Sequence, residues 1–157
     1  MEDAKRHSLQ TMNLDPLKEI LRLHALYLDG DPNGKRADLR QVDLQGANLQ
    51  GVNLQGALLP HFQIPMGDLI VFKKLSAGVI CELLIPAAAR RTATLVGRKC
   101  RAEYAIVKSG SGISKRDPGF RYEEGATVRP DAYDDDIRIE CAPGIHFFCT
   151  RAEAEEY

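Results

Sequence analysis

Leucine recurs every five residues from residue 39 to residue 59, and a small apolar residue stands two positions before each leucine. An α-helix turns about 500° in five residues, so these leucines would not share one face of a helix. On a flat strand, an odd spacing places successive leucines on opposite faces. A chain that turns one corner per unit keeps all of them inside, and a fixed period is typical of stacked coils. The pattern therefore predicts a solenoid.

The other positions of each five-residue unit favour turns. Asp or Asn precedes each of the first four leucines, where a short polar side chain can bond to nearby backbone and stabilise a turn. Gly46, Gly51 and Gly56 add conformational freedom between the units. At the end of the segment, Leu58 replaces the polar residue and Pro60 follows, so we expect the coil to end there.

The residues ADLRQVDLQGANLQGVNLQGALLP resemble the pentapeptide-repeat family, whose motif is A(D/N)Lxx, over positions 37–59. The resemblance implies a right-handed quadrilateral β-helix with four repeats in each coil, so this segment would form about one coil. It also implies an interior of leucines with alanine and valine beside them, namely Leu39, Leu44, Leu49, Leu54, Leu59, Ala37, Val42, Ala47 and Val52.

An amphipathic helix is predicted just before the repeats. Asp15 followed by Pro16 is typical of a helix start, apolar residues then recur at helical spacing, and Asp29-Gly30 ends the segment. Because one coil cannot bury its own two ends, we expect this helix to cap the first edge of the coil. His24 lies in its apolar stripe, so we expect a packed histidine rather than a ligand or a base. The segment is similar to the helix that leads into the repeats of many phage proteins.

Beyond residue 60, short β-rich runs alternate with turn residues, which predicts a mostly antiparallel α+β domain. Strands are predicted at 69–72 and 79–85, which form a hairpin, at 101–107, at 120–122 and 126–128 as a pair, at 137–141 and at 145–148. Thr150 to Glu153 reads T-x-x-E, a capping box that begins a short terminal helix. The predicted fold is therefore α+β, with an arm and capping helix at 1–34, the coil at 35–60 and the β-rich domain at 61–157.

The segments GRKCRAEYAIV and FRYEEGATVRPDAYDDDIRIECAPGIHFFCTRAEAEEY are similar to a domain that follows pentapeptide repeats in proteins of phages and large DNA viruses. This resemblance covers residues 66–157. It implies a viral or prophage source and names no activity.

Composition adds limits to this interpretation. The chain has 157 residues, is 44% hydrophobic and carries a net charge of -1, so no global charge favours nucleic acid or an anionic membrane as a partner. The first residues lack an apolar signal region and no later run is long enough to cross a bilayer, so we expect a cytoplasmic protein, in the host cytoplasm if it is viral. The four cysteines lack the spacings of a secreted disulfide framework and are expected to be reduced.

Four residues of metal-binding type suggest a zinc site, namely Cys100, Cys141, His146 and Cys149. None of their pairs has C-x-x-C spacing. On a predicted strand, Phe147 and Cys149 point to one side and His146 and Phe148 to the other, which disfavours a shared metal and a Cys-His dyad. We therefore predict no metal, no cofactor and no catalytic residue, and select His146 as the candidate functional residue of this segment.

Two charged clusters supply further candidates for binding. Basic residues gather between 90 and 101 and acidic residues between 134 and 140, without the pattern of a calcium loop or the aromatics that stack on bases. We expect these two clusters to face each other or to face a partner. The predicted binding residues are His146, Arg98, Arg101, Asp134 and Asp136. Residues 109–112, Ser-Gly-Ser-Gly, followed by Lys115, lack the spacing of a phosphate-binding loop and predict a hairpin tip.

These observations support two hypotheses of function. The first is a non-enzymatic interaction module, phage or prophage encoded, that binds or inhibits a host or viral protein. A second copy of the chain is a further candidate partner, which would form a homo-oligomer. The interaction module is favoured because no nucleophile, base or metal set converges in the sequence. The alternative is a small-ligand-binding or enzymatic C-terminal domain centred near His146, which a deep pocket joining His146 to Arg or Asp residues would support.

Overall fold

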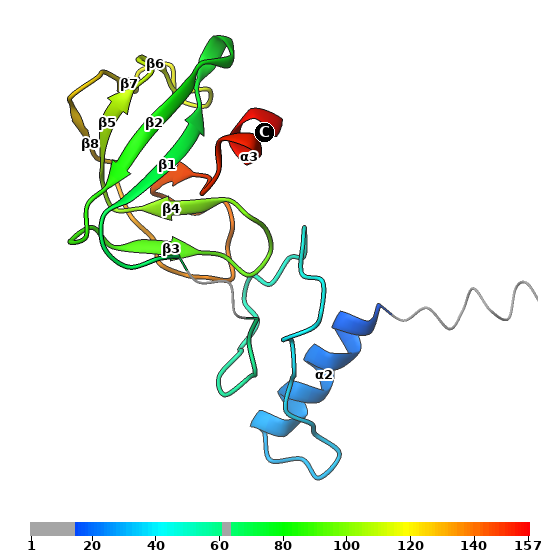
Figure 1. The fold of residues 1–157 in the computed structure, drawn as a ribbon. Helices are drawn as coiled ribbons and strands as arrows, with labels where there is room; N and C mark the ends of the chain where they lie inside the picture. The colour runs from blue at the N-terminus through cyan, green and yellow to red at the C-terminus, as the bar shows by residue number, and fades with distance from the viewer. Residues whose placement is uncertain (1–14, 61–63) are drawn as a thin grey trace, which may run out of the picture. The chain divides into compact units, whose positions relative to one another are not determined.

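A computed structural model describes residues 15–60 and 64–157, which divide into two units (Figure 1). The first unit holds residues 15–43 and 51–60, and the second holds residues 44–50 and 64–157. The described part of the chain contains no helix that is both long and apolar enough to cross a membrane.

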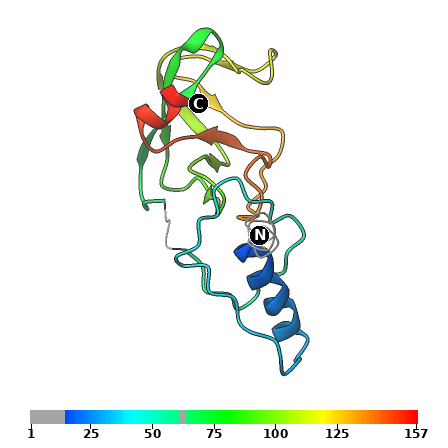
Figure 2. The ribbon, with the colours of Figure 1, turned by 90° about the vertical axis from the view of Figure 1, so that its right-hand side faces the viewer.

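Helix α2, Pro16–Leu28, begins and ends where the sequence predicts. The carboxylate of Asp15 accepts a hydrogen bond from the Leu17 N–H at 3.1 Å, which satisfies one of the free donors of the first turn. After the helix the chain turns back along it, and the Lys35 N–H donates to the Leu23 carbonyl at 2.9 Å (Figure 2). A Cβ on Gly34 would lie 2.2 Å from the Tyr27 nitrogen, so only glycine fits at this close approach.

His24 joins α2 to the first repeat. Its side chain is fully buried, and its Nδ1 accepts a hydrogen bond from the Ala37 N–H at 3.1 Å. Because Nδ1 is the acceptor, the imidazole proton lies on Nε2. The prediction of a packed histidine is confirmed, and its partner is the backbone of the first repeat.

The repeat segment has the turns that its sequence predicts. Leu39 and Leu49 are fully buried, and Leu44 is 3% exposed. The side chains of Asn48 and Asn53 each accept a hydrogen bond, at 3.0 Å, from the backbone N–H two residues later. The three glycines between units all have positive φ, between 71° and 77°. Residues with a Cβ adopt this conformation at a cost, which explains glycine at these positions.

The chain also returns to its own start within the first unit. Asp38 forms a parallel bridge with Leu58, twenty residues later. The Leu39 N–H donates to the Leu58 carbonyl at 2.8 Å, and the Leu58 N–H donates to the Ala37 carbonyl at 2.9 Å. Leu58 is therefore held by the backbone of the first repeat.

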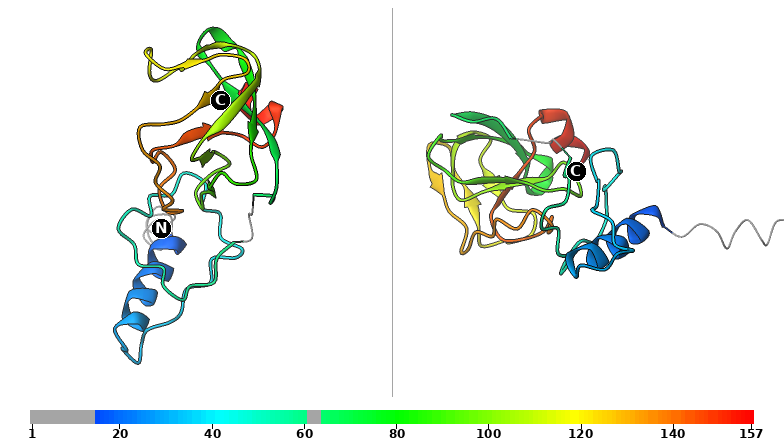
Figure 3. Two further views of the ribbon diagram at one scale, coloured as in Figure 1. Left: turned by 90° about the vertical axis from the view of Figure 1, so that its left-hand side faces the viewer. Right: turned by 90° about the horizontal axis from the view of Figure 1, so that it is seen from below.

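In the second unit, residues 64–157 form antiparallel sheets and a short helix, which confirms the predicted α+β class (Figure 3). A four-stranded sheet has the order β1 (Leu69–Lys74), β2 (Ile80–Ile85), β5 (Ala105–Ser109) and β8 (Thr127–Val128). A three-stranded sheet has the order β3 (Arg91–Ala93), β4 (Cys100–Ala102) and β9 (Ile145–Phe147), and a third sheet pairs β6 (Gly112–Ile113) with β7 (Arg121–Tyr122). Helix α3, Arg151–Glu156, packs on β1 and β2.

The predicted hairpin and terminal helix are confirmed. Strands β1 and β2 pair antiparallel across a short 3-10 turn, Ser76–Gly78. Alternate residues of β2 are buried, so Cys81, Leu83 and Ile85 form the core together with residues of β5 and β9. At the start of α3, the Thr150 hydroxyl accepts from the Glu153 N–H at 3.3 Å and donates to its carboxylate at 2.8 Å.

Three strand predictions are wrong. In each case, contacts with distant segments decide the structure of these short runs. The single strand at 101–107 divides into β4 and β5, which belong to different sheets. The runs at 120–122 and 126–128 do not pair with each other, because β7 pairs with β6 and β8 with β5. The run at 137–141 is not a strand. The Ile139 carbonyl instead accepts a hydrogen bond from the guanidinium of the buried Arg101 at 2.7 Å, and the Ile137 carbonyl accepts one from the Leu95 N–H at 3.0 Å.

Candidate functional site

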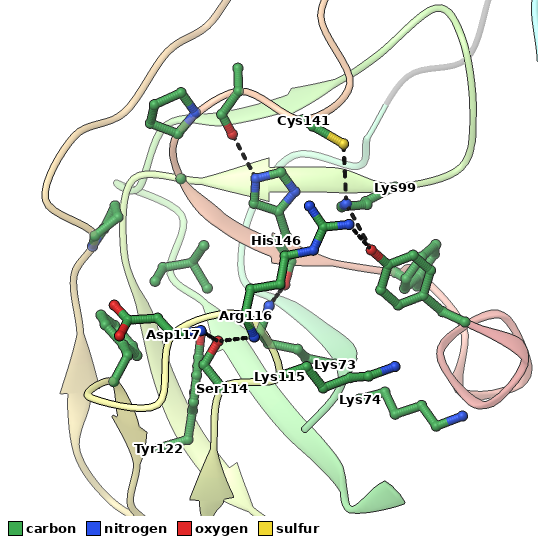
Figure 4. Close-up of a pocket in the computed structure, with 18 of the residues that line it drawn as sticks. Lys73, Lys74, Lys99, Ser114, Lys115, Arg116, Asp117, Tyr122, Cys141 and His146 are labelled. Atoms are coloured by element: carbon green, nitrogen blue, oxygen red, sulfur yellow. Dashed lines mark hydrogen bonds between the residues drawn. The ribbon is translucent and has the colours of Figure 1, made fainter. Parts of the chain in front are cut away.

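His146 lies on β9 with its side chain in the wall of a cavity of about 360 Å³ in the second unit (Figure 4). Alternation along the strand explains this position. Phe147 is 1% exposed and packs in the core, and Cys149 packs against the same core, whereas His146 and Phe148 line the cavity. The predicted division of these side chains between two faces is confirmed.

Segments far apart in the sequence build the cavity. The end of β1 provides Lys73 and Lys74, the residue before β4 is Lys99, and the loop between β6 and β7 provides residues 114–117. The segment 141–146 forms another wall, and Tyr157, which follows α3, contributes its ring. An antiparallel bridge between Phe72 and Phe148 places the end of β1 beside β9.

Lys73 occupies an inward position of β1. The residues two before and two after it, Val71 and Leu75, are fully buried, and Lys73 pairs across the hairpin with Cys81. Its Nζ donates to the carbonyl oxygen of His146 at 3.0 Å. A lysine on the core face of a strand loses part of its hydration, which is costly for a charged group.

The pKa values of two cavity residues reflect this burial. Burial, together with the positive charges of Lys99 and Arg116, lowers the pKa of Lys73 to about 8. Burial also lowers the pKa of His146 to about 4, although the hydrogen bond between its Nε2 and the Ala142 carbonyl, at 2.6 Å, acts in the opposite direction. At neutral pH the His146 ring is therefore uncharged, and its Nε2 proton is donated to Ala142.

Lys99 is almost completely buried in the cavity wall, since only 6% of it is exposed. Its Nζ donates to the Tyr157 hydroxyl oxygen at 3.1 Å and to the Cys141 sulfur at 3.6 Å. Arg116 Nη2 donates to the same Tyr157 oxygen at 2.9 Å. Burial acts to raise the pKa of Tyr157, yet the hydrogen bonds and charges of Lys99 and Arg116 outweigh it and lower that pKa.

Positive charge therefore predominates in the cavity wall. We name Lys73, Lys99, Lys115 and Arg116 the cationic cluster. Within residues 15–60 and 64–157, none of these four cations forms an ion pair with a carboxylate. Asp117 and Asp131 also line the cavity, and Figure 4 shows Asp117 and Lys99 on opposite sides of His146.

Of the five predicted binding residues, His146 lines the cavity and the other four do not. Arg101 is nevertheless the cross-strand partner of His146. Arg98 pairs with Glu153 at 2.9 Å, and Asp136 pairs with Arg138 at 2.6 Å. Arg101 is fully buried and donates to the backbone carbonyls of three residues, namely Asp134, Asp136 and Ile139. Arg101 is thus part of the folded core and holds the loop that contains the two predicted aspartates.

The basic cluster of residues 90–101 does not form one surface. Arg90 pairs with Glu103 at 3.4 Å, and Arg91 donates to backbone carbonyls that include Gly67 at 2.8 Å and Pro86 at 2.7 Å. Of this cluster, Lys99 reaches the cavity.

Among the described residues, no three His, Cys, Asp or Glu side chains lie together as metal ligands do. Of the four residues of metal-binding type, Cys141 and His146 line the cavity, while Cys100 belongs to the core.

Sequence reasoning missed the cationic cluster, although one signal was present. In the run from Leu69 to Leu75, period-two alternation places Lys73 on the same face as Val71 and Leu75. A lysine at a core position is informative, because charged residues are almost never fully buried without a partner. No comparable local signal marks Lys99 or Arg116.

Two family models match the chain. Residues 60–154 match a family of unknown function (DUF5758), and residues 35–59 match pentapeptide repeats (8 copies). Neither the curated proteins nor the solved structures give a match. The architecture of repeats followed by a second domain agrees with both resemblances seen in the sequence.

Proposed function

The chain belongs to this family of unknown function, DUF5758, and we propose that its C-terminal domain binds a small anionic ligand in the cavity beside His146. The observation that carries the proposal is the cationic cluster, whose four members line one cavity and, among the described residues, form no ion pair with a carboxylate. The volume of about 360 Å³ lies within the range of about 300–1,000 Å³ that is usual for small-molecule sites.

The positive charges of the cavity favour the binding of an anionic ligand. Like charges that are brought together away from water repel one another, which disfavours their charged forms. Lys73 shows this effect, because burial and the charges of Lys99 and Arg116 lower its pKa to about 8. A bound anion would relieve the repulsion and would give a charged partner to Lys99, which is 6% exposed. Binding, and not catalysis, is proposed because His146 is uncharged and already donates its Nε2 proton to the Ala142 carbonyl.

A second inference concerns the repeat segment and α2. We infer that the repeat segment forms one quadrilateral coil and that α2 caps it. The return of the chain after twenty residues supports the coil, since four five-residue sides make one turn. The hydrogen bond from Ala37 to His24 supports the cap. The hypothesis of a protein partner stays a prediction, as does the hypothesis of a homo-oligomer.

Isothermal titration calorimetry with inorganic phosphate, sulfate and citrate tests the anion site in the full chain. We expect at least one anion to bind the wild type, and binding to weaken about tenfold or more when Lys99→Ala removes one charged donor. Lys108→Ala is the matched control, because Lys108 is an exposed lysine of β5 that does not line the cavity. Equal loss in both variants, or no binding of any anion by the wild type, contradicts the proposal.

A further inference from the structure

The position of the Tyr157 hydroxyl indicates where an anionic oxygen of a ligand binds. Lys99 Nζ and Arg116 Nη2 converge on this one oxygen, at 3.1 and 2.9 Å. The ring of Tyr157 also lies under Lys99 and Lys115, whose Nζ atoms are 5.0 and 5.3 Å from its centroid. Three cations thus surround a side chain whose oxygen is shared by two donors.

From this arrangement we propose that the ligand is a phosphomonoester of a hydroxyl-bearing molecule, such as a sugar phosphate or a nucleotide. Its phosphate would take the place of the Tyr157 hydroxyl between Lys99 and Arg116. The inference rests on the proposed anion site and adds the chemical class and the orientation of the ligand.

The charge of the cluster favours phosphate over carboxylate. A phosphate monoester carries close to two negative charges at neutral pH and three acceptor oxygens. The cationic cluster offers Arg116, whose planar guanidinium can donate two parallel hydrogen bonds, and lysines that act as point charges. A single carboxylate has one charge, so it would leave more of this positive charge uncompensated.

The remainder of the cavity requires a ligand with hydrogen-bond donors. Asp117 and Asp131 line it, and ionised carboxylates only accept hydrogen bonds. Asp117 lies on the other side of His146 from Lys99 (Figure 4). A wholly anionic ligand that filled the cavity would be repelled there, whereas hydroxyl or amino groups could donate to these carboxylates. A free phosphate ion would leave most of the 360 Å³ to water.

Tyr157 must move when such a ligand binds, because its hydroxyl occupies the donors of Lys99 and Arg116. Tyr157 is 45% exposed, so its side chain has room to rotate toward solvent, at the cost of its ring contact with Phe148. Tyr157→Phe keeps the ring beside Lys99, Lys115 and Phe148 but removes the competing oxygen. We expect this variant to bind phosphomonoesters about threefold to tenfold more tightly, the range that one hydrogen bond accounts for.

Calorimetric titrations of the full chain test the ligand class. The probes are ribose 5-phosphate, adenosine 5′-monophosphate, inorganic phosphate, succinate, ribose and adenosine. We expect one of the two phosphomonoesters to bind at least tenfold more tightly than inorganic phosphate or succinate, and the neutral compounds not to bind. The comparison of the two phosphomonoesters tells a sugar phosphate from a nucleotide.

Asp117→Asn is the matched variant for orientation. Asn retains the oxygen that accepts from the Gly119 N–H, at 3.0 Å in the wild type, so the turn is preserved while the charge is lost. We expect weaker binding of the phosphomonoester and no loss of affinity for inorganic phosphate.

The inference is wrong, while the anion site stands, if succinate or inorganic phosphate binds as tightly as the phosphomonoesters. It is also wrong if Tyr157→Phe weakens the binding of the phosphomonoesters. If no anion binds the wild type, or if Lys99→Ala binds anions no more weakly than Lys108→Ala does, both proposals fail.

Discussion

Replacement of Arg101 by Met is the sharpest test of how this domain is built. Arg101 is fully buried, and its guanidinium donates to the carbonyls of Asp134, Asp136 at 2.6 Å and Ile139 at 2.7 Å. Met retains an apolar side chain of similar length but donates nothing. The segment 134–139 would then lose the group around which it folds.

The expected loss in the free energy of unfolding follows from the three hydrogen bonds that Arg101 donates. Each bond to a charged group contributes about 1.5–3 kcal/mol, and part of the loss is recovered when freed carbonyls reach water. We therefore expect Arg101→Met to lower the free energy of unfolding by about 3–5 kcal/mol, a large share of the stability of a small domain. Arg101→Lys keeps the charge but cannot reach three carbonyls at once, so we expect an intermediate loss.

Urea unfolding followed by far-UV circular dichroism measures this loss, with Arg90→Met as the control. Arg90 is exposed and pairs with Glu103 at 3.4 Å, so we expect its replacement to cost less than about 1 kcal/mol. Hydrogen exchange in Arg101→Met would show earlier exchange of the backbone amides of 134–139 than in the wild type. A stability within about 1 kcal/mol of wild type, at an unchanged urea dependence, would refute the role assigned to Arg101.

Three further predictions concern pH and packing. Anion binding is expected to weaken as pH rises above about 8, where Lys73 loses its proton, and titrations at pH 7 and 9 measure this. The pKa of His146 is lower in the folded chain than its ordinary 6.5, so between pH 6.5 and 4 the unfolded chain binds more protons and stability falls as pH falls. Allowing for partial exposure, we expect a loss of about 2 kcal/mol that urea unfolding shows in the wild type and not in His146→Asn. Leu49→Ala, at a fully buried repeat leucine, is expected to cost about 2–5 kcal/mol in the same assay, and a loss below about 1 kcal/mol would contradict its interior position.

Part of the candidate site is predictable from local pattern. His146 stands on a strand whose neighbouring residue, Phe147, belongs to the core, and the structure places His146 in a cavity wall. Lys73 follows from the same alternation, since it lies between Val71 and Leu75 on one face of β1. Arg98 and Arg101 were predicted from charge clustering along the chain, and neither lines the cavity, because such clustering carries no information on where long side chains end.

The sequence by itself determined the features that depend on neighbours a few residues away. Asp15 caps α2, Thr150 and Glu153 cap α3, and the asparagines and glycines of the repeat set its turns, because each of these contacts closes within a few residues. The five-residue period of the leucines likewise excludes a helix and a flat strand on geometry alone.

Only the tertiary structure decided which strands pair and therefore which cations meet. Strands β4, β7, β8 and β9 have two or three residues each, too few for their pattern to select a partner. Pairing of β9 with β4, and its bridge to β1, brings Lys73, Lys99 and His146 to one cavity from positions far apart in the chain. A single buried charge costs free energy, and whether several such charges gather at one cavity depends on pairing between distant segments, which local sequence does not encode.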